Sequence, residues 1–141
     1  MKKDRISLSP DETLAIGIEL GTNAKKGDIF GLMGGLGSGK TVLAKGIAKG
    51  LGVADEITSP TFTLLEIYAG RLALYHFDLY RIEGGAELDA LFFEEYWFGD
   101  GVSVIEWAEK AGARLGDGIT TVRIEYVDEN TRRITAEYPD H

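Results

Sequence analysis

Gly34-Gly35-Leu36-Gly37-Ser38-Gly39-Lys40-Thr41 is the stretch of this chain that decides its fold. It fits the pattern G-x-x-x-x-G-K-[ST], the loop that wraps the phosphates of ATP or GTP. Residues 28–33 before it form an apolar run typical of a short buried strand. Residues 41–48 after it carry apolar side chains at helical spacing. Strand, loop and helix in this order predict a phosphate-binding loop, which we call the glycine loop (residues 34–41).

The residue types of the glycine loop suit that chemistry. Glycines allow successive backbone N–H groups to turn inward at a helix N-terminus, where they bind anions. Lys40 is expected to reach the β- and γ-phosphates, and the Thr41 hydroxyl to bind Mg²⁺. The residues expected to contact a nucleotide at this loop are Gly37, Ser38, Gly39, Lys40, Thr41 and Val42.

Composition restricts the class of protein. A length of 141 residues predicts one domain over residues 1–141, and the absence of cysteine excludes disulfides, thiolate metal sites and a cysteine nucleophile. No apolar run is long enough to span a bilayer, and no signal sequence is evident, so we expect a cytoplasmic protein. The net charge is −8, and no Lys/Arg run exceeds two residues, so tight direct binding of RNA or DNA is not expected.

Flanking patterns predict the other elements. Ser9-Pro10-Asp11-Glu12 is typical of a helix start, and Gly21 is expected to end that helix. Later segments are β-rich runs with turn residues between them and one helical stretch. They are a hairpin over 61–68 and 71–77, a helix over 86–93, a strand over 101–106, and strands over 119–127 and 132–138. We therefore predict an α/β fold, a P-loop NTPase-like three-layer sandwich with a mixed parallel and antiparallel central sheet.

Two acidic residues end apolar runs, as a Walker B element does. Asp78 closes the run 72–78 and Glu106 closes the run 102–106. One of them could hold Mg²⁺ while the other orients the attacking water or hydroxyl, since phosphoryl transfer needs both functions. The alternatives are that Asp78 caps the following turn and that Glu106 is solvated at a strand end.

Three further features have open interpretations. His76 is interpreted as a buried sheet residue rather than a catalyst. Trp107 either stacks near the nucleotide or packs in the core. Residues 59–63, Ser-Pro-Thr-Phe-Thr, form a hydroxyl-rich loop that either senses the γ-phosphate or is an ordinary turn.

Five sequence blocks occur together in this order: the glycine loop and residues 59–64, 76–81, 94–96 and 105–107. Together they resemble the TsaE (YjeE) family, small bacterial ATPases of tRNA threonylcarbamoyladenosine biosynthesis, and the resemblance runs from about Thr13 to Arg133. It implies Mg²⁺-dependent ATP binding with weak hydrolysis. It also implies two protein partners, TsaD and TsaB, which modify adenosine 37 of tRNAs reading ANN codons, so this chain would meet tRNA only indirectly.

The resemblance also implies roles for single residues. Lys40 would bind phosphate, Thr41 and Glu106 would bind Mg²⁺, and Asp78 would orient water. With Lys40 and Asp78, Thr61 is a candidate catalytic residue in the switch-like loop. Trp107 would be the family's tryptophan near the nucleotide site, and the base would lie between the first helix start, around Glu12, and the last turn near Arg132. The chain departs from the family pattern at Gly35, where an acid is common, and at Ser38, where alanine is common.

A small P-loop kinase is the alternative function. Such enzymes clamp two phosphate-bearing substrates with several arginines in a lid, and no segment of this sequence is an obvious basic lid. A GTPase is a third candidate, but the sequence has neither an Asn-Lys-x-Asp element for guanine nor an Asp-x-x-Gly after the strands.

Overall fold

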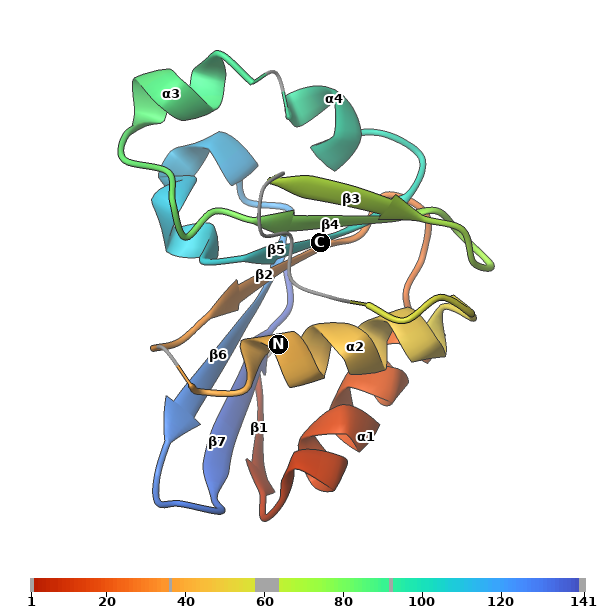
Figure 1. Ribbon diagram of the computed structural model, residues 1–141, viewed down its shortest axis with the longest axis vertical. Coiled ribbons are helices and arrows are strands. Elements are labelled where there is room, and N and C mark those ends of the chain that lie inside the picture. The colour runs from red at the N-terminus through yellow and green to blue at the C-terminus, as the bar shows by residue number, and fades with distance from the viewer. Residues whose placement is uncertain (1, 36, 58–63, 92, 140–141) are drawn as a thin grey trace.

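The computed structural model describes residues 2–35, 37–57, 64–91 and 93–139, which form a seven-stranded sheet with helices on both faces (Figure 1). The strands are β1 (Lys2–Ser7), β2 (Ile29–Met33), β3 (Leu65–Tyr68), β4 (Leu74–Asp78), β5 (Val102–Glu106), β6 (Thr120–Tyr126) and β7 (Arg132–Glu137). The helices are α1 (Pro10–Thr22), α2 (Lys40–Gly50), α3 (Gly85–Asp89), α4 (Glu94–Trp97), and the 3₁₀ turns η1 (Ala108–Lys110) and η2 (Gly112–Leu115).

The sheet mixes parallel and antiparallel strands, as predicted. Its order is β1-β7-β6-β2-β5-β4-β3. The central strands β6, β2, β5 and β4 are parallel, whereas β1, β7 and β3 pair antiparallel at the edges. The glycine loop follows β2 in the parallel centre, so it lies at the carboxyl edge where α/β proteins bind ligands.

The structure corrects several predicted boundaries. Strand β1 was not predicted, and α1 ends at Thr22, one residue beyond Gly21. The hairpin of β3 and β4 is confirmed, but β4 begins at Leu74 because the backbone N–H of Arg71 donates to the Leu51 carbonyl oxygen instead of to a neighbouring strand. The predicted helix over 86–93 ends at Asp89. The first hairpin residues, 61–63, lie outside the described residues.

Side chains alternate between two cores on opposite faces of the sheet. The first core packs β2, β4, β5, β6 and β7 against α1 and α2, and the second packs the other face of β2, β4 and β5 against α3, α4 and the 3₁₀ turns (Figure 1). Leu74 of β4 and Val104 of β5 belong to the first core. Because strand residues alternate with period two, His76, Asp78 and Glu106 share the face that carries α2.

Helices α1 and α2 approach backbone to backbone. A Cβ atom on Gly46 would lie 2.4 Å from the carbonyl oxygen of Leu14, and one on Gly17 would lie 2.5 Å from that of Leu43. Only glycine permits this spacing. The Ser9 hydroxyl caps α1 by accepting the Glu12 N–H at 3.1 Å. The close packing places the capped start of α1 beside the start of α2, where the glycine loop ends.

Candidate nucleotide site

The carboxyl ends of β4 and β5 bring the two predicted acids side by side. Asp78 and Glu106 are direct register partners across this parallel pair. Glu106 is 2% exposed, which contradicts the alternative that it is solvated at a strand end. A carboxylate buried this deeply needs donors to offset its loss of water.

Glu106 finds one of these donors at the end of the glycine loop. The Thr41 hydroxyl donates to Glu106 Oε1 at 3.1 Å, joining the first turn of α2 to the end of β5. Gly39, the N-cap of α2, has φ +108, and Gly37 has φ +74, both left-handed values that favour glycine. The glycines of the loop thus permit the turn that aims Thr41 at Glu106.

The Lys40 side chain is folded back onto the glycine loop. Its Nζ donates to the carbonyl oxygens of Gly34 at 2.6 Å and Gly35 at 2.8 Å, and lies 4.0 Å from the centre of the Trp107 ring. Burial lowers the pKa of Lys40, while the nearby carboxylate of Glu106 opposes this change. The ammonium is therefore enclosed by carbonyls and an aromatic face at the position expected for phosphate.

Trp107 reaches this position through an unusual backbone. Its φ of 60 and ψ of 42 make it the one non-glycine residue with positive φ in the described part of the chain. Such a conformation costs about 1–2 kcal/mol and tends to occur at functional sites. The centre of its ring lies 5.0 Å from that of Tyr80, and Trp107 both lines the cleft and packs against the second core, so the structure is compatible with both interpretations of Trp107.

Asp78 combines both interpretations given to it. Its Oδ1 accepts the Tyr80 N–H at 3.0 Å, which is the turn-capping bond. The same side chain borders the cleft beside Lys40. Burial raises the pKa of Asp78, the neighbouring Glu106 adds to the rise, and the bond from Tyr80 opposes it.

These side chains line one cleft of about 430 Å³. Its walls are Gly37, Ser38, Gly39, Lys40, Thr41, Val42, Asp78, Tyr80, Glu106 and Trp107. A second pocket of about 230 Å³ shares Gly37, Ser38, Gly39 and Val42 with the first and lies toward the start of α1. Its other walls are Ser9, Pro10, Thr13, Glu129, Asn130 and Arg132. Because the two pockets share four lining residues, they adjoin at the glycine loop.

Two other residues predicted for the nucleotide site, Arg132 and Glu12, do not line the cleft that holds Lys40. Arg132 lines the second pocket, but its donors bind main-chain carbonyls, including that of Ser38 at 3.0 Å. Glu12 does not line either pocket, and its carboxylate accepts the Leu8 N–H at 3.2 Å. Thr61 lies outside the described residues. Sequence reasoning missed Tyr80 and Thr13, for which the sequence carries no signal beyond their nearness to Asp78 and to the helix start.

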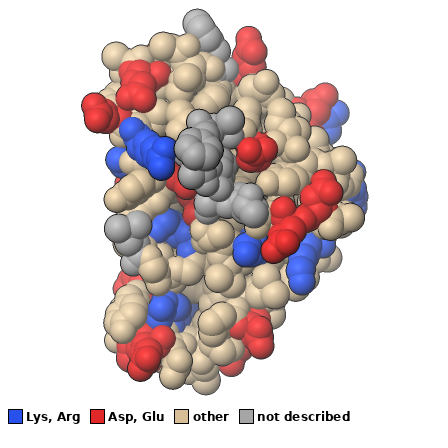
Figure 2. Space-filling model, viewed as in Figure 1, with Lys and Arg blue, Asp and Glu red and all other residues tan. Residues whose placement is uncertain are grey.

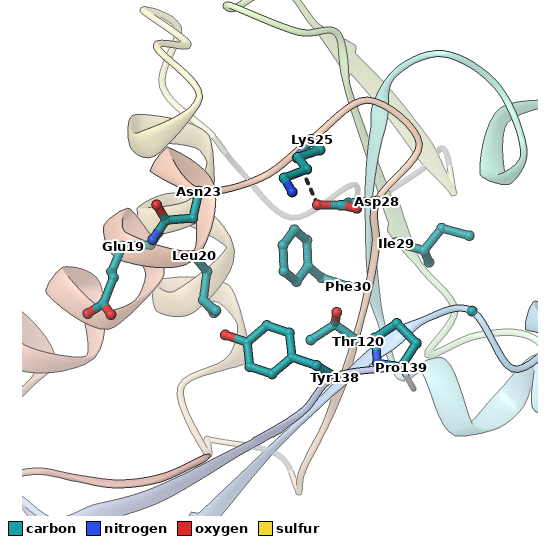
Figure 3. Close-up of a pocket in the computed structure, with 11 residues that line it drawn as sticks. Glu19, Leu20, Asn23, Lys25, Asp28, Ile29, Phe30, Thr120, Tyr138 and Pro139 are labelled. Atoms are coloured by element: carbon teal, nitrogen blue, oxygen red, sulfur yellow. Dashed lines mark hydrogen bonds between the residues drawn. The ribbon is translucent and has the colours of Figure 1, made fainter. Parts of the chain in front are cut away.

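A separate pocket of about 340 Å³ lies away from all the predicted residues (Figure 3). Phe30, Leu20 and Tyr138 form its apolar walls, and Asp28 accepts the Lys25 N–H at its rim. It adjoins the beginning of β2, whereas the glycine loop follows the end of that strand.

Acidic and basic side chains are interspersed over the face shown in Figure 2. The described helices are all too short or too polar to cross a membrane.

Fold and site together define an α/β protein of the P-loop NTPase-like class, with a glycine loop between a central parallel strand and the helix that follows it. The profile of the family described as "Threonylcarbamoyl adenosine biosynthesis protein TsaE" matches residues 7–134. The chain therefore belongs to the TsaE family, which takes part in tRNA threonylcarbamoyladenosine biosynthesis.

Proteins similar in sequence or structure match this chain over nearly its whole length. The TsaE protein of Treponema pallidum is 40% identical over 130 residues, covering 92% of this chain and 96% of the relative. That of Bacillus subtilis is also 40% identical, covering 92% and 81%. The crystal structure of Bacillus subtilis YdiB matches with a TM-score of 0.82 at 35% identity, covering 99% of this chain and 87% of that one.

Proposed function

We propose that this chain binds ATP with Mg²⁺, hydrolyses it slowly, and serves threonylcarbamoylation of adenosine 37 in tRNAs that read ANN codons. The observation that carries the ATP part is the 3.1 Å contact between Thr41 Oγ1 and Glu106 Oε1 in the cleft at the glycine loop. A loop hydroxyl beside a strand-end carboxylate is how P-loop proteins hold a magnesium nucleotide. Family membership supports the tRNA part.

The donor set fits Mg²⁺. Hydroxyl and carboxylate oxygens are hard ligands, and Mg²⁺ usually binds through one or two protein groups plus phosphates and water. No three His, Cys, Asp or Glu side chains gather as a metal cage in the described ranges, which agrees with a cation that arrives with its nucleotide. Thr41 and Glu106 would hold it, and the ion would neutralise phosphate charge.

The other residues of the cleft take up the remaining roles. Lys40 binds phosphate by exchanging its bonds to the Gly34 and Gly35 carbonyls for phosphate oxygens. Asp78 orients the attacking water, and its raised pKa makes the carboxylate a better proton acceptor than an exposed aspartate. Thr61 is the candidate for sensing the γ-phosphate.

The base occupies the second pocket, next to the start of α1. Arg132 lines this pocket while its guanidinium donates to main-chain carbonyls, so it would contact the base as part of the pocket wall. Glu12 lies outside the pocket lining, and its carboxylate accepts the Leu8 N–H. Trp107 lines the cleft that holds Lys40 and does not line the second pocket. It covers the phosphate end of the nucleotide.

The chain acts through protein partners, TsaD and TsaB, and reaches tRNA only through them. Its net charge of −8 disfavours direct contact with a polyanion. The ATP state controls docking onto the partner complex and resets it between turnovers, in the cytoplasm. Equal partner affinity with ATP, with ADP and without nucleotide would contradict this control.

Reconstitution tests the proposal. The chain is mixed with the partner enzymes, tRNA and ATP, and modified tRNA is counted per partner complex. We expect multiple turnovers with the unaltered chain and none with Lys40→Ala. Modification that continues without this chain would refute the tRNA role. Phosphate transferred to an acceptor, instead of released as inorganic phosphate, would favour the small P-loop kinase.

A further inference from the structure

His76 holds the side of Glu106 that faces away from Thr41. His76 Nε2 lies 2.6 Å from Glu106 Oε2, while Thr41 bonds to Oε1. His76 is 0% exposed and Glu106 is 2% exposed. The two carboxylate oxygens are thus fixed from two elements, β4 and α2, and the carboxylate cannot rotate without breaking one of these bonds.

The bonding pattern defines the tautomer of the ring. A carboxylate only accepts hydrogen bonds, so Nε2 must carry the hydrogen. The other nitrogen, Nδ1, is buried and has no hydrogen-bond partner among the described residues. An N–H there would be a buried donor without an acceptor, which costs about 1–3 kcal/mol. The ring is therefore committed to a single partner, Glu106.

His76 itself does not line the cleft. Val104 precedes Glu106 by two residues, so the two side chains share one face of β5. In the register of β4 and β5, His76 lies opposite Val104. An aliphatic side chain at this position would pack in the first core equally well. It would leave Oε2 buried without this donor, and the carboxylate free to turn away from Thr41.

We propose that His76 is a positioning residue for the cation: through its Nε2–H bond it orients Glu106 so that Oε1 and the Thr41 hydroxyl together face Mg²⁺. This inference rests on the proposed function, because it assumes that Glu106 and Thr41 hold Mg²⁺ with a nucleotide. Groups that orient metal ligands typically change metal affinity 10–100-fold when they are lost.

Calorimetry of ADP binding, with and without Mg²⁺, tests the inference. We expect His76→Leu to reduce the Mg²⁺-dependent gain in ADP affinity by about tenfold or more and to leave the Mg²⁺-free affinity within about twofold. His76→Gln, which keeps an N–H donor, should recover part of the gain. Leu74→Ala is the control, because it opens a cavity on the same face of β4 without touching Glu106. In a Glu106→Gln background, His76→Leu should have no further effect on the gain.

The outcomes separate the two claims. Absence of any Mg²⁺ effect in the unaltered chain contradicts the proposed function. A Mg²⁺ effect that survives His76→Leu, or that Leu74→Ala reduces equally, overturns the inference alone. Should His76→Leu not fold, nitrogen-15 NMR of the unaltered chain decides, since it has only two histidines, His76 and His141. We expect the hydrogen on Nε2 of His76 and a shift of that signal when ADP with Mg²⁺ is added but not with ADP alone. A hydrogen on Nδ1 with none on Nε2 overturns the inference, because Nε2 could then not donate to Glu106.

Discussion

Arg132 holds the glycine loop from outside through Ser38. Its Nε donates to the Ser38 carbonyl oxygen at 3.0 Å, and Nη2 donates to that of Gly37 at 3.3 Å. The C=O and N–H of one trans peptide group point in opposite directions. Because Arg132 binds the Ser38 carbonyl oxygen, the N–H of the same peptide group, which belongs to Gly39, points away from Arg132. The guanidinium also stacks 4.6 Å from the Tyr126 ring, which fixes its own position.

Replacing Arg132 should loosen the loop and weaken nucleotide binding. Each lost hydrogen bond contributes about 0.5–1.5 kcal/mol, so we expect Arg132→Ala to reduce ADP affinity by about tenfold. Arg132→Lys should recover only part of the loss, because an ammonium lacks the planar fork. Calorimetry measures both. Arg133→Ala is the matched control, since Arg133 forms an exposed pair with Asp4. Equal losses for Arg132→Ala and Arg133→Ala would show that the contact with the loop is irrelevant.

Local patterns predicted the glycine loop, its flanking strand and helix, and the acids at the ends of β4 and β5. These features depend on residues close in sequence, and the period-two or helical spacing of apolar residues predicts them. The bond from Arg132 to Ser38 spans 94 residues, and the pairing of His76 with Glu106 depends on strand register. Neither follows from spacing along the chain. Strand β1 was missed because its exposed, charged residues acquire strand geometry only by pairing with β7.

Lys40→Ala should abolish nucleotide binding without harming the fold. The ammonium is the strongest candidate for contact with phosphate, and its loss should weaken ATP affinity by about 100-fold or more, since hydrogen bonds to charged groups contribute about 1.5–3 kcal/mol each. Because burial lowers the pKa of Lys40, its charged form is disfavoured in the folded state, which offsets the loss of its bonds to the Gly34 and Gly35 carbonyls, so the variant should stay folded. Lys49→Ala, exposed on the same helix, is the control. Unchanged ATP affinity in Lys40→Ala would contradict the assigned role.

Asp78→Asn should stabilise the fold in a pH-dependent way while removing hydrolysis. The pKa of Asp78 is raised above its ordinary value of 3.8, so the folded state disfavours the ionised carboxylate. The unaltered chain therefore loses stability, relative to the variant, as pH rises from below 3.8 through the raised pKa. Asparagine keeps the oxygen that accepts the Tyr80 N–H.

Thermal unfolding of both chains across the acidic range measures this difference. The two unfolding temperatures should converge at the lowest pH and separate to a constant gap above the raised pKa. ADP affinity should be retained, and phosphate release from ATP should be lost. A gap that is the same at every pH would rule out desolvation of the Asp78 carboxylate as its cause.

Gly46→Ala should destabilise the fold although alanine is the better helix former. Alanine gains about 0.8–1.0 kcal/mol over glycine in a helix interior. Against this, its Cβ would lie 2.4 Å from the Leu14 carbonyl oxygen, and overpacking costs about 1–3 kcal/mol or more when backbone must move. The clash should prevail, and after the helix gain is subtracted the free energy of unfolding should fall by up to about 2 kcal/mol in chemical denaturation. Gly118→Ala is the control, because a Cβ there meets nothing within 4 Å.

The same substitution should reach the nucleotide site. Separating α1 from α2 moves the start of α1, and with it Ser9, Pro10 and Thr13, away from the glycine loop residues that share the second pocket. ADP affinity of the folded Gly46→Ala chain should fall, whereas inorganic triphosphate, which lacks a base, should bind as it does to the unaltered chain. Equal losses for both ligands would place the damage in the glycine loop itself and contradict the assignment of the base to the second pocket.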